Sequence, residues 1–304
     1  MTDWSSVVRG LACDILENAP MSDHTTFKIG GPVDALLLPH DSDTLATVIA
    51  RLQEEAIPHR LIGCGSNLLI ADEGLRGAVI RPDSRNAVIR RLDATALQVD
   101  AGYSLAKLSR CAQQYGLSGL EFACGIPGSV GGAVYMNAGA YGGEMVQVIR
   151  SAEILMPSGE RIALSNDELA LSYRRSALME TGGIVLSVTL DLTEGDPSAI
   201  HETMADLLAA RREKQPLEFP SAGSFFKRPT GYFAGKLIDD CGLRGYRVGD
   251  AQVSEKHAGF VINRGSATCE QVKQLEQDVR RRVFEQFGVE MSPEVRLWGT
   301  DWYA

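Results

Sequence analysis

Glycine is concentrated in one part of this chain. Of 31 glycines in total, nine fall among the 28 residues from Gly116 to Gly143. Glycine loses the most backbone entropy on folding and destabilises helix and strand interiors. This density therefore predicts that Gly116–Gly143 is mostly loop, with no regular helix or strand. A second, shorter glycine loop begins at Gly63 and leads into an apolar run that ends at Ile70.

Outside these loops, the hydrophobic pattern predicts regular elements. Helical spacing of apolar residues predicts helices at Asp41–Ala56, Ser104–Tyr115, Pro197–Lys214, Ala234–Cys241 and Thr268–Phe287. Short apolar or alternating runs predict strands at Arg60–Ile62, Leu68–Ile70, Ala78–Ile80, Ala87–Arg91, Leu97–Ala101, Ser151–Met156, Glu160–Ala163, Ile184–Leu192, Gly259–Asn263 and Glu294–Trp298. Because the strands cluster and do not alternate with helices, the order favours an α+β fold over a doubly wound parallel sheet.

Composition excludes several classes of function. The 304 residues suggest about two domains, and the proline- and glycine-punctuated stretch Pro216–Pro229 is a candidate boundary. A formal net charge of −9 lacks the electrostatic footprint of a nucleic-acid or anionic-membrane binder, and no apolar run is long enough to span a membrane. Residues 1–20 contain no basic region followed by an apolar run, so no signal peptide is expected.

The cysteines and histidines indicate a reducing compartment and no metal. The six cysteines are scattered without a CxxC pair, which predicts small buried thiols and a cytoplasmic location; they are Cys13, Cys64, Cys111, Cys124, Cys241 and Cys269. No two of the five histidines fall within five residues of each other, so no metal-ligand spacing occurs.

The two glycine loops carry polar donors at matching places. Ser66 and Asn67 lie in the first loop, and Ser129 and Asn137 lie in or just after the second. Glycine lets backbone N–H groups approach an anion closely, and these side chains would add donors beside them. Neither loop contains lysine or arginine, so a pyrophosphate would be held by backbone and hydroxyl groups alone. Tight turns in a compact β-rich domain are the alternative interpretation, and the repetition of the pattern favours binding.

The loops at Gly63–Ile70 and Gly125–Gly142 resemble the FAD-binding loops of the UDP-N-acetylenolpyruvoylglucosamine reductase family. The resemblance extends over nearly the whole chain, through motifs at His24–Pro32, Ser172–Ser176, Ala222–Pro229, Ala251–Phe260 and Pro293–Gly299. The short run between Leu192 and Ser221 resembles the compact variant of the family. That variant lacks an extra tyrosine-bearing substrate loop, so recognition of the substrate diphosphate must differ in detail.

The resemblance implies an α+β protein with a two-lobed FAD-binding region of the vanillyl-alcohol-oxidase/PCMH type. This region would cover residues 1–200, with lobes of about 1–83 and 84–200, and a C-terminal α+β substrate-binding domain would cover 201–304. FAD, bound without a covalent link, would contact Gly63, Cys64, Gly65, Ser66, Asn67, Leu68, Gly125, Ile126, Pro127, Gly128, Ser129, Gly131, Gly132, Asn137, Ala138 and Gly139.

The implied reaction is the NADPH-dependent reduction of UDP-N-acetylglucosamine enolpyruvate to UDP-N-acetylmuramate, in peptidoglycan precursor synthesis and hence in cell shape and division. Ser224 matches the general acid that protonates the carbon next to the substrate carboxylate. Arg174 matches the arginine that pairs with this carboxylate, and Glu294, if protonated, could donate a hydrogen bond to the intermediate. Tyr173, Lys214 and Arg244 are candidates for contacts with the nucleotide and phosphates. The enzyme would act as a monomer on a small UDP-sugar, without nucleic acid, membrane or metal.

Each of these residues also has an ordinary interpretation. Ser224 alone fits a turn or cap serine, Arg174 a solvated charge and Glu294 a surface carboxylate at a strand start. Two other functions remain open: an FAD-dependent oxidase of the same fold, and a non-catalytic nucleotide-sugar-binding module. The joint presence of the three residues favours the reductase, because an oxidase of an alcohol needs a base and no acid for an enolpyruvyl group.

Overall fold

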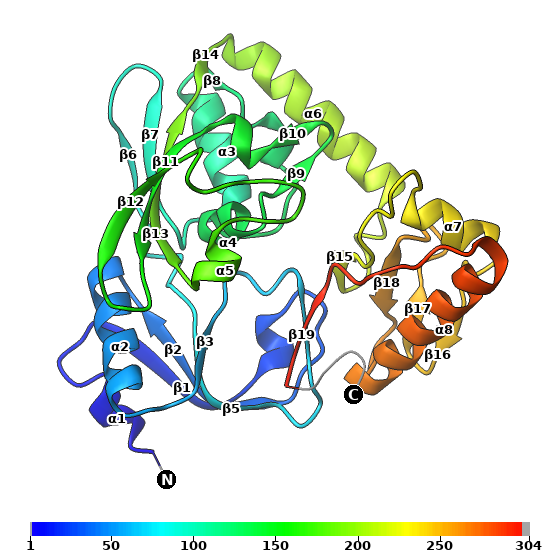
Figure 1. Ribbon diagram of the computed structural model, residues 1–304. Coiled ribbons are helices and arrows are strands. Elements are labelled where there is room, and N and C mark those ends of the chain that lie inside the picture. The colour runs from blue at the N-terminus through cyan, green and yellow to red at the C-terminus, as the bar shows by residue number, and fades with distance from the viewer. Residues whose placement is uncertain (1, 300–304) are drawn as a thin grey trace. The chain divides into compact units, whose positions relative to one another are not determined.

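The computed structural model describes residues 2–299 of the chain (Figure 1). The chain forms two compact units. Unit 1 contains the residues up to Leu16, Leu36–Cys64 and Ala78–Arg211, and unit 2 contains Glu17–Ala35, Gly65–Gly77 and the residues from Arg212 onward. The chain passes from one unit into the other at five places: between Cys64 and Gly65, and within β1 (Cys13–Pro20), β2 (Pro32–Pro39), β5 (Leu75–Ile80) and α6 (Pro197–Lys214).

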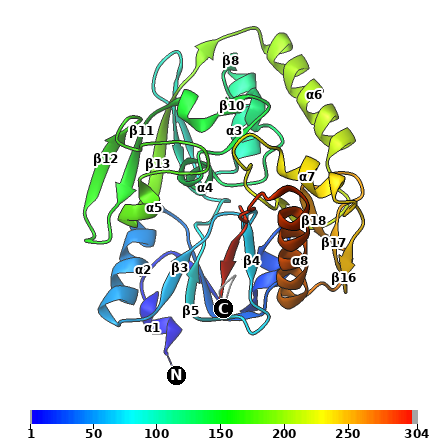
Figure 2. The same ribbon diagram turned by 45° about the vertical axis from the view of Figure 1, so that its right-hand side comes forward.

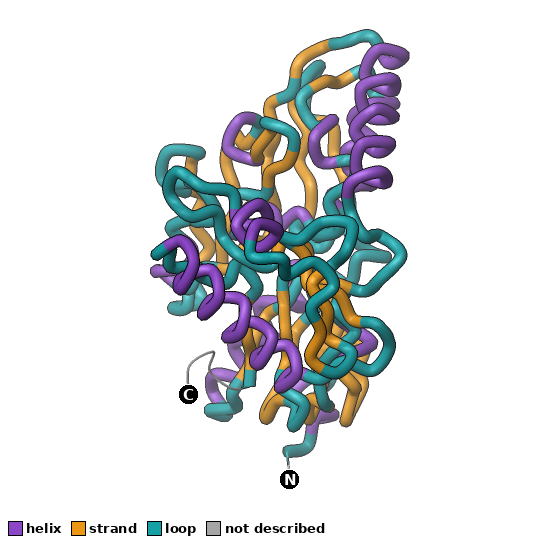
Figure 3. Tube along the Cα trace, turned by 90° about the vertical axis from the view of Figure 1, so that its right-hand side faces the viewer, coloured by secondary structure: helices purple, strands orange, loops and turns teal. Residues whose placement is uncertain are grey.

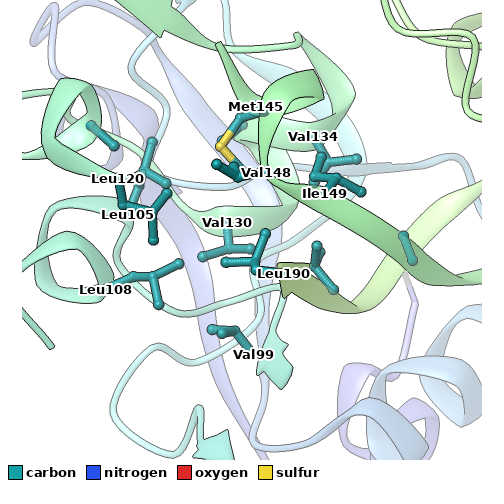
Figure 4. Packing of buried hydrophobic residues seen from close by; sticks show 14 of the residues in the cluster. Val99, Leu105, Leu108, Leu120, Val130, Val134, Met145, Val148, Ile149 and Leu190 are labelled. Atoms are coloured by element: carbon teal, nitrogen blue, oxygen red, sulfur yellow. The ribbon is translucent and has the colours of Figure 1, made fainter. Parts of the chain in front are cut away.

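The largest sheet of unit 1 has five antiparallel strands in the order β12-β11-β13-β7-β6. In chain order these are β6 (Ile89–Arg91), β7 (Ala96–Asp100), β11 (Ile149–Leu155), β12 (Arg161–Ser165) and β13 (Ile184–Asp191). Two helices pack their apolar sides onto it, α3 (Leu105–Gln114) and α4 (Val130–Tyr135), and Figure 4 shows the side chains that meet there. Ser104 and Ser129 cap these helices by accepting hydrogen bonds from Lys107 and Gly132 N–H.

Further short elements complete unit 1. A sheet of order β1-β2-β5-β3 includes β3 (His59–Leu61), which pairs with β5 in parallel. Two helices, α1 (Trp4–Val7) and α2 (Ser42–Glu54), contact each other. The remaining pieces are β8 (Leu117–Ser118), η2 (Glu121–Ala123), β9 (Gly139–Ala140), β10 (Gly143–Glu144), η3 (Met145–Gln147), α5 (Leu178–Thr181) and β14 (Thr193–Glu194). Loops and turns of varied length connect these elements, drawn in teal in Figure 3.

Unit 2 is built on a four-stranded antiparallel sheet with two helices beside it (Figure 2). The sheet has the order β15-β18-β17-β16 and contains β15 (Ser221–Ser224), β16 (Arg247–Val248), β17 (Ala251–Val253) and β18 (Phe260–Asn263). The helices are α7 (Ala234–Asp240) and α8 (Cys269–Phe287). A separate parallel pair joins β4 (Leu68–Ile70) to β19 (Arg296–Trp298), and η1 (Met21–His24) precedes the His24–Pro32 motif.

Buried polar side chains tie the segments of unit 2 together. Asn263, 1% exposed, donates from Nδ2 to Phe27 O and Lys28 O and accepts two backbone N–H groups at Oδ1. Thr26 Oγ1 donates to Ser221 O at 2.7 Å. Asp72 accepts the N–H groups of Cys269 and Glu270 and so stabilises the first turn of α8. These bonds fix the His24–Pro32 motif against the sheet of unit 2.

The predicted α+β fold is confirmed, and every predicted helix and strand has a counterpart within a few residues. The prediction that Gly116–Gly143 contains no regular helix or strand was wrong, because α4 forms through Gly131 and Gly132 and the two-residue strands β8 and β9 also lie in the segment. Packing decides this: Val130, Ala133 and Val134 are buried, and a Cβ on Gly131 would lie 2.8 Å from Ala101 Cβ. The helix therefore needs glycine at this contact in spite of its low helix propensity.

The prediction of buried thiols was only partly right. All six cysteines are free, but only Cys124 and Cys269 are buried, whereas Cys64 is exposed. Among the described residues, no helix combines the length and apolar character needed to cross a membrane.

One buried acid in α8 lacks compensation. Glu276 is 0% exposed, and neither of its carboxylate oxygens makes a hydrogen bond; Arg280 Nε lies 3.5 Å from Oε1. Burial raises the pKa of Glu276 from 4.5 to about 7, and Arg280 opposes this shift. The folded protein therefore binds a proton that the unfolded chain has released, so stability falls as pH rises from about 4.5 to about 7.

We expect Glu276→Gln to remove this pH dependence. Between pH 4.5 and pH 8, the unfolding free energy of the variant should rise relative to that of the parent by up to about 3 kcal/mol. Urea unfolding at both pH values measures the change. Glu285→Gln, on the exposed side of the same helix, is the matched control and should leave the profile unaltered. Parallel profiles for parent and Glu276→Gln would contradict the assignment.

Candidate functional site

In unit 1, the start of the first glycine loop touches the second. A Cβ on Gly63 would lie 2.2 Å from Ser129 Oγ, so no larger residue fits there without displacing this hydroxyl. Ser129 is 5% exposed, and its Oγ accepts the N–H of Gly132 at 3.3 Å as the cap of α4. The contact places Gly63 directly beside the N-terminus of α4.

The rest of the first loop lies in unit 2 and keeps backbone donors available. A Cβ on Gly65 would lie 2.4 Å from His24 O, and Gly65 has φ +63°, so glycine is required there. Gly65 O accepts the N–H of Thr26. The N–H groups of Gly65, Ser66 and Asn67 donate to no acceptor among residues 2–299. Such consecutive unpaired amides form an anion-binding concavity.

Some of the other predicted FAD contacts already form hydrogen bonds inside the protein, and others differ mainly in burial. The side chain of Asn137 is 1% exposed and is used entirely within the protein. The N–H groups of Gly131 and Ala138 donate to Ala101 O and Ala133 O. Gly125, Ile126 and Gly128 are half-buried and Pro127 is exposed, whereas Leu68 is buried as the first residue of β4.

An arginine that the sequence prediction missed lies against the second loop. Arg211 comes from α6, and a Cβ on Gly125 would lie 2.9 Å from its Cδ atom. Arg211 is half-buried, and desolvation lowers the pKa of its guanidinium. It forms no ion pair with any carboxylate of residues 2–299. A desolvated cation without an acidic partner beside a glycine loop is a suitable site for an anionic ligand.

Arg174 lies in a tight turn of unit 1. Ser172 and Arg175 exchange both backbone hydrogen bonds, at 3.0 and 3.1 Å, so Tyr173 and Arg174 form the tip. Arg174 has φ +56°, a left-handed conformation that favours glycine. Its guanidinium carbon lies 5.2 Å from the centroid of the Tyr173 ring, whose side chain is 51% exposed. The aromatic face thus supports the cation at the tip of the turn.

In unit 2, the exposed Ser224 is followed directly by two buried phenylalanines. Ser224 is exposed and ends β15, whereas Phe225 and Phe226 are 1% and 3% exposed and pack edge to face. Phe225 N–H donates to Gly259 O at 2.8 Å, and Gly223 has φ +82°, so the strand bends at the serine. The Ser224 hydroxyl makes no hydrogen bond with the described part of the chain.

Glu294 lies on the neighbouring segment. Its N–H donates to Phe225 O at 2.8 Å, and the flanking Pro293 forms a bridge with Phe226. Its carbonyl accepts a hydrogen bond from Asn67 Nδ2 at 3.2 Å. The structure therefore brings together Ser224, Glu294 and the Asn67 end of the first glycine loop, which are far apart in the sequence.

The predicted substrate contacts in unit 2 differ in availability. Arg244 binds Asp239 through two nitrogens and donates to Glu255 O at 2.8 Å, which lowers the pKa of Asp239. Lys214, at the end of α6, is exposed.

Burial lowers the pKa of His257, and its Nδ1 accepts the N–H of Gly259. This ring is therefore neutral at pH 7 and orients the backbone after it.

One group among the described residues combines three possible metal ligands, Asp14, His40 and Asp83. Arg85 already forms ion pairs with both carboxylates of this group, because its Nη2 lies 2.9 Å from an Asp14 oxygen and 2.8 Å from an Asp83 oxygen. The arginine neutralises the two carboxylates, so they are best described as an ion-pair network.

Comparison with known proteins agrees with this arrangement. The FAD binding domain family matches residues 33–165, and the family described as UDP-N-acetylenolpyruvoylglucosamine reductase, C-terminal domain, matches residues 215–298. The chain is 48% identical to the UDP-N-acetylenolpyruvoylglucosamine reductase of Caldanaerobacter subterraneus subsp. tengcongensis over 93% of each chain. It is 50% identical to the reductase of that name from Lachnoclostridium phytofermentans, over 93% of this chain and 92% of the relative.

A solved structure gives the same result. The UDP-N-acetylenolpyruvylglucosamine reductase from Thermus caldophilus superposes with a TM-score of 0.78 at 37% identity, covering 95% of this chain and 99% of that one. The fold and the domain match define an FAD-binding oxidoreductase. At this identity and coverage, the chain belongs to the UDP-N-acetylenolpyruvoylglucosamine reductase family.

We expect Gly63→Ala to destabilise unit 1 by about 1–3 kcal/mol, because the new methyl group overlaps Ser129 Oγ. Adding Ser129→Ala should recover much of this loss, since the nearest remaining atom, Ser129 Cβ, would lie 3.3 Å away. Thermal unfolding of the two single variants and the double variant measures the coupling. Gly265→Ala, whose methyl group would find its nearest neighbour at 3.4 Å, is the control. Strictly additive effects would mean that the loops do not touch.

Proposed function

We propose that this chain reduces UDP-N-acetylglucosamine enolpyruvate to UDP-N-acetylmuramate with NADPH, through bound FAD. One observation carries the assignment of the chemistry. Two buried phenylalanines hold the exposed Ser224 hydroxyl beside the segment of Glu294, in a member of this reductase family. A serine that only forms a turn or caps a helix uses its hydroxyl in a hydrogen bond to a nearby backbone group. Ser224 makes no such hydrogen bond within the described residues.

The residues fit FAD in three respects. Unpaired amides at Gly65–Asn67 offer donors to a diphosphate, Gly63 and Gly125 leave room for close approach, and Arg211 provides a cation without an acidic partner. We assign Arg211 to the diphosphate, in addition to the backbone and hydroxyl donors. When bound, FAD would accept a hydride from NADPH and pass it to the substrate. The absence of a suitable loop histidine favours FAD held without a covalent bond.

Side chains of the protein then stabilise the charge that develops on the substrate and donate a proton to it. Addition of hydride to the enolpyruvyl methylene carbon leaves an electron pair on the carbon that bears the carboxylate. The Arg174 guanidinium pairs with this carboxylate and stabilises the added charge, and we assign the Glu294 carboxyl group to the same centre. Ser224 Oγ donates its proton to the carbon and completes the reduction. Tyr173, Lys214 and Arg244 are the groups we assign to the nucleotide and phosphates; Arg244 must exchange its bonds to Asp239 for this role.

The domain assignment follows the same division of roles. Residues 1–200, with lobes of about 1–83 and 84–200, would bind FAD, and residues 201–304 would bind substrate. We place the enzyme in the cytoplasm as a monomer that supplies cell-wall precursor for growth, cell shape and division. The free cysteines support a reducing compartment.

Ser224→Ala tests the acid. We expect anaerobic NADPH to bleach the flavin at the parental rate, while reoxidation by the enolpyruvyl substrate falls by about 10²- to 10⁴-fold, because only the second step needs the proton. Stopped-flow absorbance at the flavin band separates the two steps. Ser292→Ala, another exposed serine of unit 2, is the control. Parental reoxidation in Ser224→Ala would exclude this serine as the acid, and reoxidation only by oxygen in the parent would favour an oxidase.

Arg211→Met tests the cation. Loss of a charge-assisted hydrogen bond of about 1.5–3 kcal/mol should weaken FAD binding by about 10- to 100-fold, while the long apolar stem of methionine preserves packing on Gly125. Titration of the apoprotein with FAD, followed by flavin fluorescence, gives the dissociation constant. Arg212→Met removes the neighbouring exposed cation of α6 and should change the affinity little. Equal effects of both variants would assign the role to general charge.

A further inference from the structure

The turn that carries Arg174 is held at both ends by buried side chains. Asn137 Nδ2 donates to Ser172 O at 3.1 Å, on the entering side of the turn. Ser176 Oγ donates to Tyr135 O at 2.8 Å, on the leaving side. Asn137 is 1% exposed and Ser176 0% exposed, so neither bond competes with water. Both bonds connect the turn to the end of α4 and the loop that follows it.

Asn137 is itself held rigidly. Its Nδ2 also donates to Glu144 Oε2 at 2.9 Å, and its Oδ1 accepts the N–H of Val146 at 3.0 Å. Its backbone has φ +41°, a left-handed conformation that asparagine tolerates better than most residues. With both Nδ2 hydrogens donated inside the protein, this amide cannot also donate to a cofactor without breaking one of these bonds.

The turn needs such support. Arg174 is a non-glycine residue with φ +56°, and backbone strain of this kind persists only where the surroundings over-determine the conformation. Tyr173 and Arg174 lie at the tip, outside any strand of residues 2–299; the Ser172–Arg175 bridge closes the turn, and Ala177 N–H donates to Leu169 O at its base. The bonds from Asn137 and Ser176 supply the missing restraint.

We propose that Asn137 and Ser176 are positioning residues that fix the turn Ser172–Arg175 and so place the Arg174 guanidinium for the substrate carboxylate. This inference rests on the proposed function of Arg174 and changes the expected role of Asn137 from cofactor contact to support of the turn. It adds Ser176, which had no individual role among the residues predicted from the sequence. A misplacement of about 1 Å can slow a positioned reaction by about 100-fold, so small side chains far from the reacting atoms matter here.

Ser176→Ala is the sharper test, because it removes one hydroxyl and adds no bulk. We expect the holoenzyme to bind FAD and to be reduced by NADPH as the parent is. Reoxidation by the enolpyruvyl substrate should slow by about 10- to 100-fold. Asn137→Ala should show the same selective loss. Ser109→Ala is the matched control: Ser109 is 1% exposed, its Oγ donates to the backbone carbonyl of Leu120 at 2.7 Å, and it makes no hydrogen bond to the turn, Asn137 or Val146 within residues 2–299.

A double-variant cycle separates positioning from general destabilisation. If Ser176 acts through Arg174, adding Ser176→Ala to Arg174→Ala should not slow reoxidation further. A similar additional loss in both backgrounds, or equal slowing of both half-reactions, would overturn the proposal. Loss of FAD affinity alone in Asn137→Ala would return that residue to the cofactor site. Failure of the proposed function looks different: Arg174→Ala itself would then reoxidise at the parental rate.

Discussion

The parallel pairing of β4 with β19 is the constraint on which the reactive part of unit 2 depends. It aligns Leu68–Ile70 with Arg296–Trp298 and brings the end of the first glycine loop next to the segment that contains Glu294. Two further hydrogen bonds close the junction, from Asn67 Nδ2 to Glu294 O and from Arg296 N–H to Asn67 O. Because β4 and β19 come from distant parts of the sequence, a loop assigned to the cofactor and a carboxylate assigned to the substrate share one rigid frame. A change in either strand would move both.

Burial of two phenylalanine rings fixes the position of Ser224 in a similar way. A hydroxyl is a weak acid, and it protonates carbon only where the base is strong and the geometry is exact. Phe225 and Phe226 fix the backbone on one side of Ser224, and the left-handed Gly223 turns the chain on the other. The Ser224 hydroxyl is thereby exposed next to two buried rings, which is compatible with the role proposed for it.

The sequence predicts most elements of regular structure, and it fails where tertiary packing decides. Helices such as α2 and α8 are predictable because apolar spacing and a capping residue agree; Asp41 and Thr268 cap them in the structure. In contrast, β1 was not predicted, since most of its residues are exposed, and β15 is a four-residue strand that contains a left-handed glycine. Likewise, α4 exists because Ala101 and the core accept Gly131, which no local pattern reveals. Motif resemblance identified Ser224, Arg174 and Glu294 as candidates, but Arg211 escaped it because the helix α6 brings this cation to Gly125 from far along the chain.

Hydrogen-bond occupancy explains why a motif alone cannot distinguish a ligand from the scaffold that positions it. Asn137, Ser129 and Asn67 all occur in glycine loops and look like ligand donors, yet each binds inside the protein, at Ser172 O, Gly132 N–H and Glu294 O respectively. Ser224 and Arg211 keep their polar atoms available, although Arg211 lies outside both loops and belongs to a chain with a net charge of −9. A buried polar group that is already satisfied gains little by binding an anion, whereas an unsatisfied one gains the full benefit of desolvated contact. Use of both Asn137 Nδ2 hydrogens inside the protein therefore favours a supporting role for this residue, whereas the Ser129 hydroxyl hydrogen and one Asn67 Nδ2 hydrogen have no acceptor among residues 2–299 and stay candidates for ligand binding.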